Sequence, residues 1–87
     1  MQVFVAERSL KGISMNDLAA AQKRAIETAE RLTREGRQVK YLRSTFVPDS
    51  GSCCCLFEAH DAATVEMLNI AARIPYDRVA PALDLHP

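Results

Sequence analysis

The sequence lacks several features that would place it in a functional class. It has no tryptophan and no excess of charge of either sign, because 11 lysine and arginine residues balance 11 aspartate and glutamate residues. Nucleic-acid-binding domains normally carry a clear basic excess, so we expect no nucleic-acid partner. No apolar run approaches the ~18 residues of a membrane span, and the first residues lack the order of a signal peptide. We therefore expect a cytoplasmic protein without a membrane partner.

Cysteine is scarce and is confined to one run, Cys53 to Cys55. An odd number of cysteines in a chain without a secretion signal argues against a disulfide framework, and no zinc-type spacing is present. Successive strand residues point to opposite faces, so the three thiols cannot converge on one metal ion. We expect Cys53 and Cys55 to be buried as small hydrophobic residues. Cys54 then lies on the opposite face, where it is a candidate ligand or redox thiol.

The hydrophobic pattern predicts four strands and two helices in a single domain, residues 1–87. We expect strands at residues 2–8, 39–47, 53–59 and 79–85. The first helix begins after Ser14, ends before Gly36 and carries one apolar stripe: Leu18, Ala21, Ala25, Ala29 and Leu32. The second helix begins after Asp61, ends at Pro75 and carries another: Ala62, Val65, Leu68 and Ala72.

The element order βαββαβ predicts a ferredoxin-like α+β fold. Right-handed crossovers place the first and third strands in the centre of a four-stranded antiparallel sheet, with both helices on one face. Pro81 agrees with an edge position for the last strand, because proline cannot donate a ladder hydrogen bond. The turn at residues 48–51 sets the hairpin register with Val47 opposite Ser52, which pairs Tyr41 with Glu58.

In this register the face of the sheet without helices is apolar. We expect it to carry a set of mostly apolar side chains: Val3, Val5, Val39, Tyr41, Val47, Cys54 and Leu56. Such a face is rarely left in water, so we expect it to pack on a second copy and close a dimeric α+β barrel. The few polar groups inside that barrel are the candidate ligand-binding residues: Glu7, Tyr41, Arg43, Cys54 and Glu58.

The charged candidates also allow a structural interpretation. Arg43 and Glu58 lie diagonally across the hairpin, so they form either an internal ion pair or a ligand-binding pair. Glu7 is either a buried base or ligand, or the partner of a cation such as Arg8 or Arg78.

Two histidines are the candidate metal ligands. His60 and His86 fall at the ends of two parallel strands, so their backbones lie near one sheet edge, ~10 Å apart. With Glu58 or Asp84 they form a donor set that suits an imidazole-preferring ion such as nickel. The alternative is that both are solvated histidines near the end of a strand.

Four short segments of the chain are shared with a known family: residues 4–10, the strand from Ser44 to Pro48 and Asp49, residues 55–59 and residues 74–79. They resemble a bacterial family of domains of unknown function that includes a small nickel-binding protein. The resemblance implies a ferredoxin-like fold, a homodimeric barrel and a transition metal, nickel, as cofactor. Members often have a histidine in the second strand and another in the second helix, where this chain has Arg43 and Leu68. The resemblance therefore does not supply those ligands here.

The sequence is compatible with three functions. The first is a homodimeric domain of unknown biological role that binds a small molecule or a transition metal. The second is a cofactor-free oxygenase or isomerase on the same dimeric barrel, and the third is an inert interaction module. No histidine falls on the predicted interior, which disfavours the enzyme. Arg43 would also repel a cation, so we expect nickel affinity no better than micromolar, carried by His60 and His86.

Overall fold

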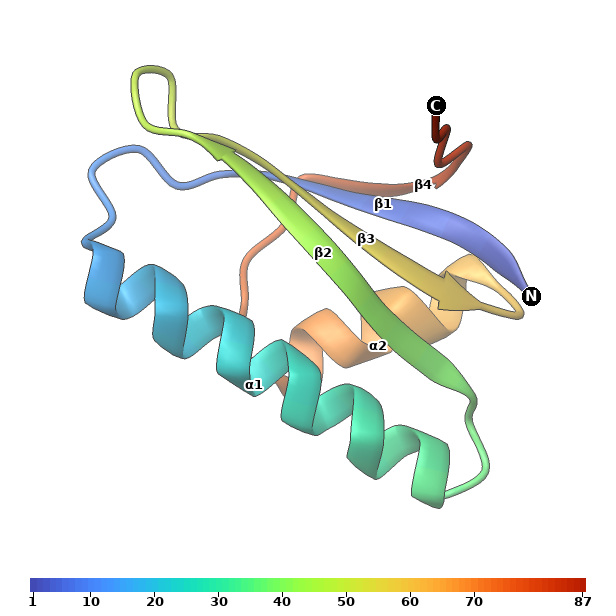
Figure 1. The fold of residues 1–87 in the computed structure, drawn as a ribbon. Helices are drawn as coiled ribbons and strands as arrows, with labels where there is room; N and C mark the ends of the chain where they lie inside the picture. Colours follow the sequence, from blue (N-terminus) through green and yellow to red (C-terminus); the bar gives the residue numbers. More distant parts are fainter.

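A four-stranded antiparallel sheet is covered on one face by two helices in the computed structural model, which describes residues 1–87 (Figure 1). The sheet has the strand order β2-β3-β1-β4, which confirms the predicted ferredoxin-like topology. The elements in chain order are β1 (Gln2–Ser9), α1 (Met15–Arg34), β2 (Val39–Val47), β3 (Ser52–Ala59), α2 (Ala62–Ala71) and β4 (Arg78–Ala82). Neither helix is both long enough and apolar enough to span a membrane.

Both helices begin at side-chain caps that the sequence predicts. Ser14 Oγ accepts a hydrogen bond from the Asp17 N–H at 3.0 Å at the start of α1. Asp61 Oδ1 accepts from the Thr64 hydroxyl at 2.7 Å and from the Thr64 N–H at 2.8 Å at the start of α2. These bonds, that from the hydroxyl first, lower the pKa of Asp61 because they favour its charged form.

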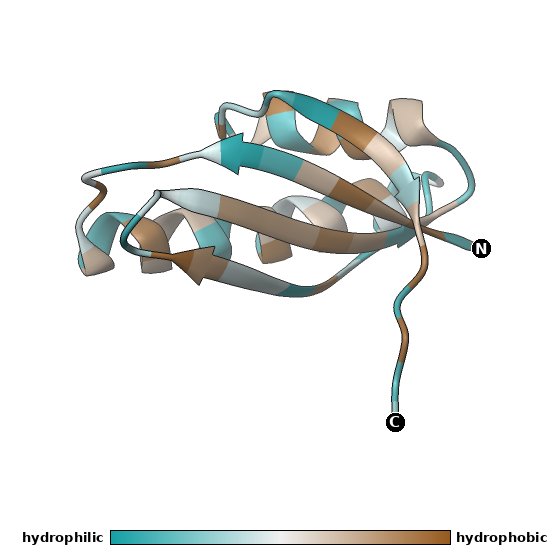
Figure 2. Ribbon diagram, turned by 90° about the horizontal axis from the view of Figure 1, so that it is seen from above, coloured by the Kyte–Doolittle hydropathy of each residue, from teal (hydrophilic) through white to brown (hydrophobic).

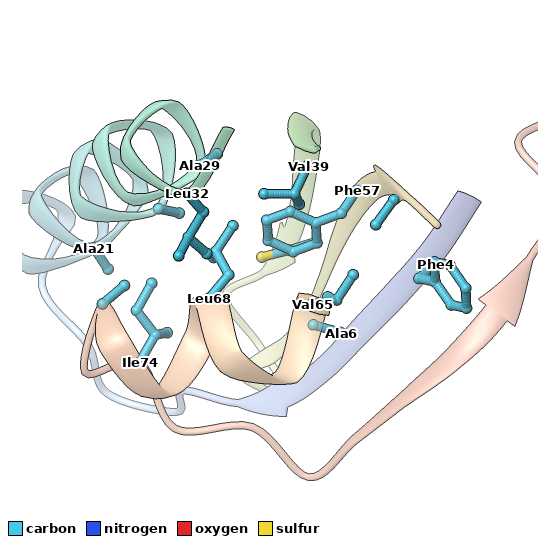
Figure 3. Packing of buried hydrophobic residues seen from close by; sticks show 14 of the residues in the cluster. Phe4, Ala6, Ala21, Ala29, Leu32, Val39, Phe57, Val65, Leu68 and Ile74 are labelled. Atoms are coloured by element: carbon cyan, nitrogen blue, oxygen red, sulfur yellow. The ribbon is translucent and has the colours of Figure 1, made fainter. Parts of the chain in front are cut away.

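The core lies between the helices and the sheet (Figure 3). Phe57, Val65 and Leu68 are fully buried at its centre. The apolar stripe of α1 packs on the sheet through small side chains, notably Ala21 and Ala25. These alanines occupy little volume, so they leave space between α1 and the sheet.

The β2–β3 hairpin has an irregularity that the sequence does not reveal. Pairing runs as expected from the turn as far as Arg43, and then the register shifts between Arg43 and Tyr41. Tyr41 consequently lies opposite Phe57, and the predicted Tyr41–Glu58 pair is wrong. The extra residue, Leu42, reverses the alternation of side chains beyond it.

The shift moves two predicted open-face residues into the helix-covered layer. Val39 is buried, and the Tyr41 ring meets the edge of Phe57 with their centroids 5.6 Å apart. The open face is therefore less apolar at the β2 edge than the sequence predicts.

The last strand is shorter than predicted. β4 ends at Ala82, whereas the expected strand continued to residue 85. Residues 83–87 leave the sheet on the side opposite the helices (Figure 1) and pass across one end of it (Figure 2). We call this segment the C-terminal tail. Its Leu83 and Leu85 side chains are 86% and 84% exposed.

Candidate functional site

The open face of the sheet has an apolar centre and charged margins. The strand register places one row of apolar residues across the middle, with Leu56 and Ala80 on either side of Val5. Figure 2 looks onto this face and shows hydrophobic residues along the strands at the middle of the sheet. The charged residues of the face lie around that centre: Glu7, Lys40, Arg43, Glu58 and Arg78.

Glu7 pairs with Arg78 across β1 and β4. Arg78 Nη2 lies 2.9 Å from Glu7 Oε2, and Arg78 Nε donates to both carboxylate oxygens at 3.0 and 3.1 Å. The side-chain hydrogen bond from Arg78 lowers the pKa of Glu7, so this carboxylate stays charged. Of the two interpretations of Glu7, the structure shows pairing with a cation, which makes it a poor general base.

Arg43 has a different partner from the one expected. Its Nη2 pairs with Asp84 Oδ1 of the C-terminal tail, not with Glu58, and Glu58 forms no salt bridge within the chain. Asp84 Oδ2 also lies 3.2 Å from His86 Nε2. One carboxylate thus holds both an arginine and a histidine on the open side of the sheet.

His60 belongs to a separate group of residues. It follows β3, and its Nε2 lies 3.1 Å from Gln38 Oε1. No group of three or more His, Cys, Asp or Glu side chains in the chain is arranged to hold a metal ion. His86 and Asp84 form only a pair, so the residues of a single chain do not fit a nickel site.

The three cysteines divide between the faces as the alternation predicts. Cys54 is exposed on the open face, whereas Cys53 and Cys55 are buried on the helix side with their sulfur atoms 3.9 Å apart. Burial, reinforced by the neighbouring Cys55, raises the pKa of Cys53 to about 11. Cys53 is therefore a protonated thiol at neutral pH and a poor nucleophile.

The structure also buries one charged residue that the sequence interpretation left among the possible partners of Glu7. Arg8 follows Phe4 and Ala6 on the inward face of β1 and is buried with them beneath the helices. Strict alternation along β1 is the signal that predicts this position.

Two comparisons with known proteins agree with this architecture. The family model described as nickel responsive protein SCO4226-like matches residues 4–81. The chain is also similar to the crystal structure of SCO4226 from Streptomyces coelicolor A3(2), with a TM-score of 0.81 and 20% sequence identity, over 95% of this chain and 99% of that one. At this identity the structural likeness supports the fold alone. No curated protein matches the chain, and neither comparison points to an oxygenase or an isomerase.

Proposed function

The chain belongs to the family of nickel responsive SCO4226-like proteins, and from that membership we propose that it is a homodimer that binds a small molecule or a metal ion between two open sheet faces. The observation that carries this proposal is the apolar centre of the open face, which has no cover within the chain. Val3, Val5 and Leu56 are only half-buried there. An apolar sheet face of this kind is normally covered in solution.

A second copy of the chain is the occupant that the charges of this face favour. Its margins carry residues of both signs, with Lys40 and Arg78 near Glu7 and Glu58, so two copies related by a two-fold axis need not repel each other. The C-terminal tail stands on the same side and exposes Leu83 and Leu85. These side chains add apolar area that a face-to-face partner can cover.

The polar residues of the open face would line the space between two such sheets. Glu58 and Cys54 have no side-chain partner on their own chain, and Arg43 reaches the same region from β2. The Glu58 carboxylate can accept a hydrogen bond from a ligand, and the Arg43 guanidinium can donate one to a negatively charged group. Together they suit a ligand that carries both a hydrogen-bond donor and a charged acceptor.

Nickel is the ligand that the family description favours. One chain brings only His86 and Asp84 together, and a two-fold axis would supply a second pair. Imidazole and carboxylate groups are suitable nickel ligands, but Arg43 competes for the same Asp84 carboxylate. We therefore propose weak nickel binding that depends on the dimer.

Sedimentation of the wild-type protein tests the dimer directly, and we expect a dimer at micromolar concentration. Leu56→Lys should give monomers or unfold the chain, because it would bury an unpaired charge at a cost of several kcal/mol. Ile70→Lys is the matched control, since Ile70 is 68% exposed on α2, far from the open face. A wild-type monomer at high concentration, or a Leu56→Lys protein that remains dimeric, would contradict the proposal.

A further inference from the structure

A separate cavity lies on the other face of the sheet, beneath α1. Its volume is about 200 Å³. Its lining is mostly apolar and comes from α1, the sheet and the segments that follow β1 and α2: Leu10, Leu18, Ala21, Ala25, Phe46 and Ile74. Figure 3 shows Ala21 and Ile74 of this lining at one end of the core. Alanine at positions 21 and 25 leaves space that a larger side chain of α1 would fill.

Arg8 is the one charged residue that lines the cavity. Arg8 is only 3% exposed and is among the lining residues. Its Nη1 donates to the Pro75 carbonyl oxygen at 3.0 Å, whereas Nε and Nη2 have no hydrogen-bond partner. Nε–H and Nη2–H lie on the same edge of the planar group and point the same way, which is the fork that binds a carboxylate through two parallel hydrogen bonds.

Nothing in the chain neutralises this guanidinium. Arg8 forms no salt bridge, and no Asp or Glu lines the cavity. Cys53 is its register partner on β3, but burial keeps that thiol protonated. A buried charge with two unsatisfied donors is costly, so a bound anion at this edge would stabilise the fold.

A polar rim marks the way into the cavity. Gln22 and Ser44 are exposed lining residues on α1 and β2. Gln22 Nε2 donates to the Tyr41 hydroxyl at 3.0 Å, and that hydroxyl lies 2.6 Å from Ser44 Oγ. The Leu42 bulge brings Tyr41 to this rim by turning it to the helix side of β2.

We propose that this cavity binds a small monocarboxylate with a short apolar or aromatic body. On binding, the carboxylate displaces the side chains that seal Arg8 Nε and Nη2 from the cavity and receives a hydrogen bond from each, and the body packs between α1 and the sheet against Leu18 and Phe46. A cavity of ~150 Å³ accommodates benzene, so this one suits a ligand of about eight or nine non-hydrogen atoms, such as hexanoate or benzoate. The apolar lining disfavours a bare inorganic anion, and the guanidinium disfavours a metal ion. The site is independent of the proposed dimer interface, which lies on the opposite face of the sheet.

Titration of the protein with hexanoate and benzoate, followed by two-dimensional NMR and thermal unfolding, tests the proposal. Both carboxylates should raise the unfolding temperature and shift the amide signals of β1 and α1. Hexanamide and benzamide have the same bodies without the charge and should bind at least tenfold more weakly. Equal binding of acid and amide, no binding of either acid, or inorganic phosphate binding as tightly as hexanoate would overturn the proposal.

Single substitutions test the Arg8 charge and the cavity volume separately. Arg8→Met should weaken hexanoate binding by roughly tenfold to a hundredfold, because it removes a pair of charge-assisted hydrogen bonds. Arg34→Met, at an exposed position of α1, is the matched control and should leave binding unchanged. Ala21→Leu keeps Arg8 but fills the cavity, so it should abolish binding in a folded protein. Ala21→Leu decides the question if Arg8→Met does not fold. Undiminished hexanoate binding by a folded Arg8→Met or Ala21→Leu protein overturns the proposal.

Discussion

Arg43 of β2 and Asp84 of the C-terminal tail lie 41 residues apart in the sequence and form an ion pair. Asp84 is mostly buried, with a side-chain exposure of 15%, although it belongs to a tail that is otherwise open to solvent. Its second oxygen receives His86. This carboxylate therefore links the C-terminal tail to β2.

Asp84→Asn should release the C-terminal tail without unfolding the domain. Arg43 is half exposed, so we expect the free energy of unfolding to change by no more than about 1 kcal/mol. Backbone NMR relaxation of residues 83–87 should report larger fast motions in the variant. Arg31→Met removes the exposed Arg31–Glu35 pair of α1 and should leave the tail unchanged. A tail that stays rigid in Asp84→Asn would show that other contacts hold it.

Nickel titration calorimetry should give an affinity no tighter than micromolar. The structure gives the two candidate histidines separate partners, with His86 beside Asp84 and His60 beside Gln38. We therefore expect His86→Ala to lower the affinity more than His60→Ala does. Tight binding that survives the double variant would mean that Glu58 and Cys54 of the open face hold the metal instead.

Cys53 should make the protein less stable at alkaline pH. Burial raises its pKa from 9.0 to about 11, so between pH 9 and 11 the unfolded chain loses a proton that the folded chain keeps. The free energy of unfolding then falls as pH rises, by at most ~1.4 kcal/mol per pH unit from this group.

Urea unfolding of wild type and Cys53→Ala at several pH values checks this effect. The variant should be the less stable protein at pH 7, because it loses a buried side chain. The difference in the free energy of unfolding between wild type and Cys53→Ala should become smaller between pH 9 and 11. Cys54→Ala, at an exposed position, serves as the control, and its free energy of unfolding should change with pH as that of wild type does. A constant difference for Cys53→Ala across this range would rule out the linkage.

Gly51→Ala should destabilise the protein strongly. Gly51 has φ +78°, and an added Cβ would collide with the Lys11 backbone at its N and Cα atoms, so the backbone must shift. Gly36 is the matched control, because it has φ +98° but no atom within 4 Å of an added Cβ. We expect Gly51→Ala to cost about 1–3 kcal/mol more than Gly36→Ala in chemical denaturation. Equal costs would mean that the Lys11 backbone yields easily.

Local sequence patterns predicted those parts of the fold that depend on nearby residues. Helix caps, the hairpin turn and strand alternation each involve groups a few positions apart, which explains why Ser14, Asp61 and the hairpin register near Val47 were predicted correctly. The Leu42 bulge was not predictable, because whether β2 accommodates an extra residue depends on its packing against α1. That single residue changed the face on which Tyr41 lies.

The candidate site was predicted less completely for the same reason. The Arg43–Asp84 pair joins β2 to the C-terminal tail, and these segments are far apart in the sequence. The hairpin register placed Glu58 diagonally opposite Arg43 and gave no indication that Asp84 would be its partner. Alternation of side chains along β1 predicts that Arg8 points inward and is buried. An inward arginine is so unusual, however, that pairing with Glu7 on the surface was the simpler expectation.

The two edges of the sheet carry features that limit how chains can associate. β4 contains Pro81, which lacks an N–H, and β2 contains the Leu42 bulge. An edge with a missing donor or a distorted ladder is a poor template for strand addition from another molecule. The sheet is therefore protected against the open-ended, edge-to-edge polymerisation that leads to fibrils. Self-association of this protein should stop at closed assemblies formed through the sheet face.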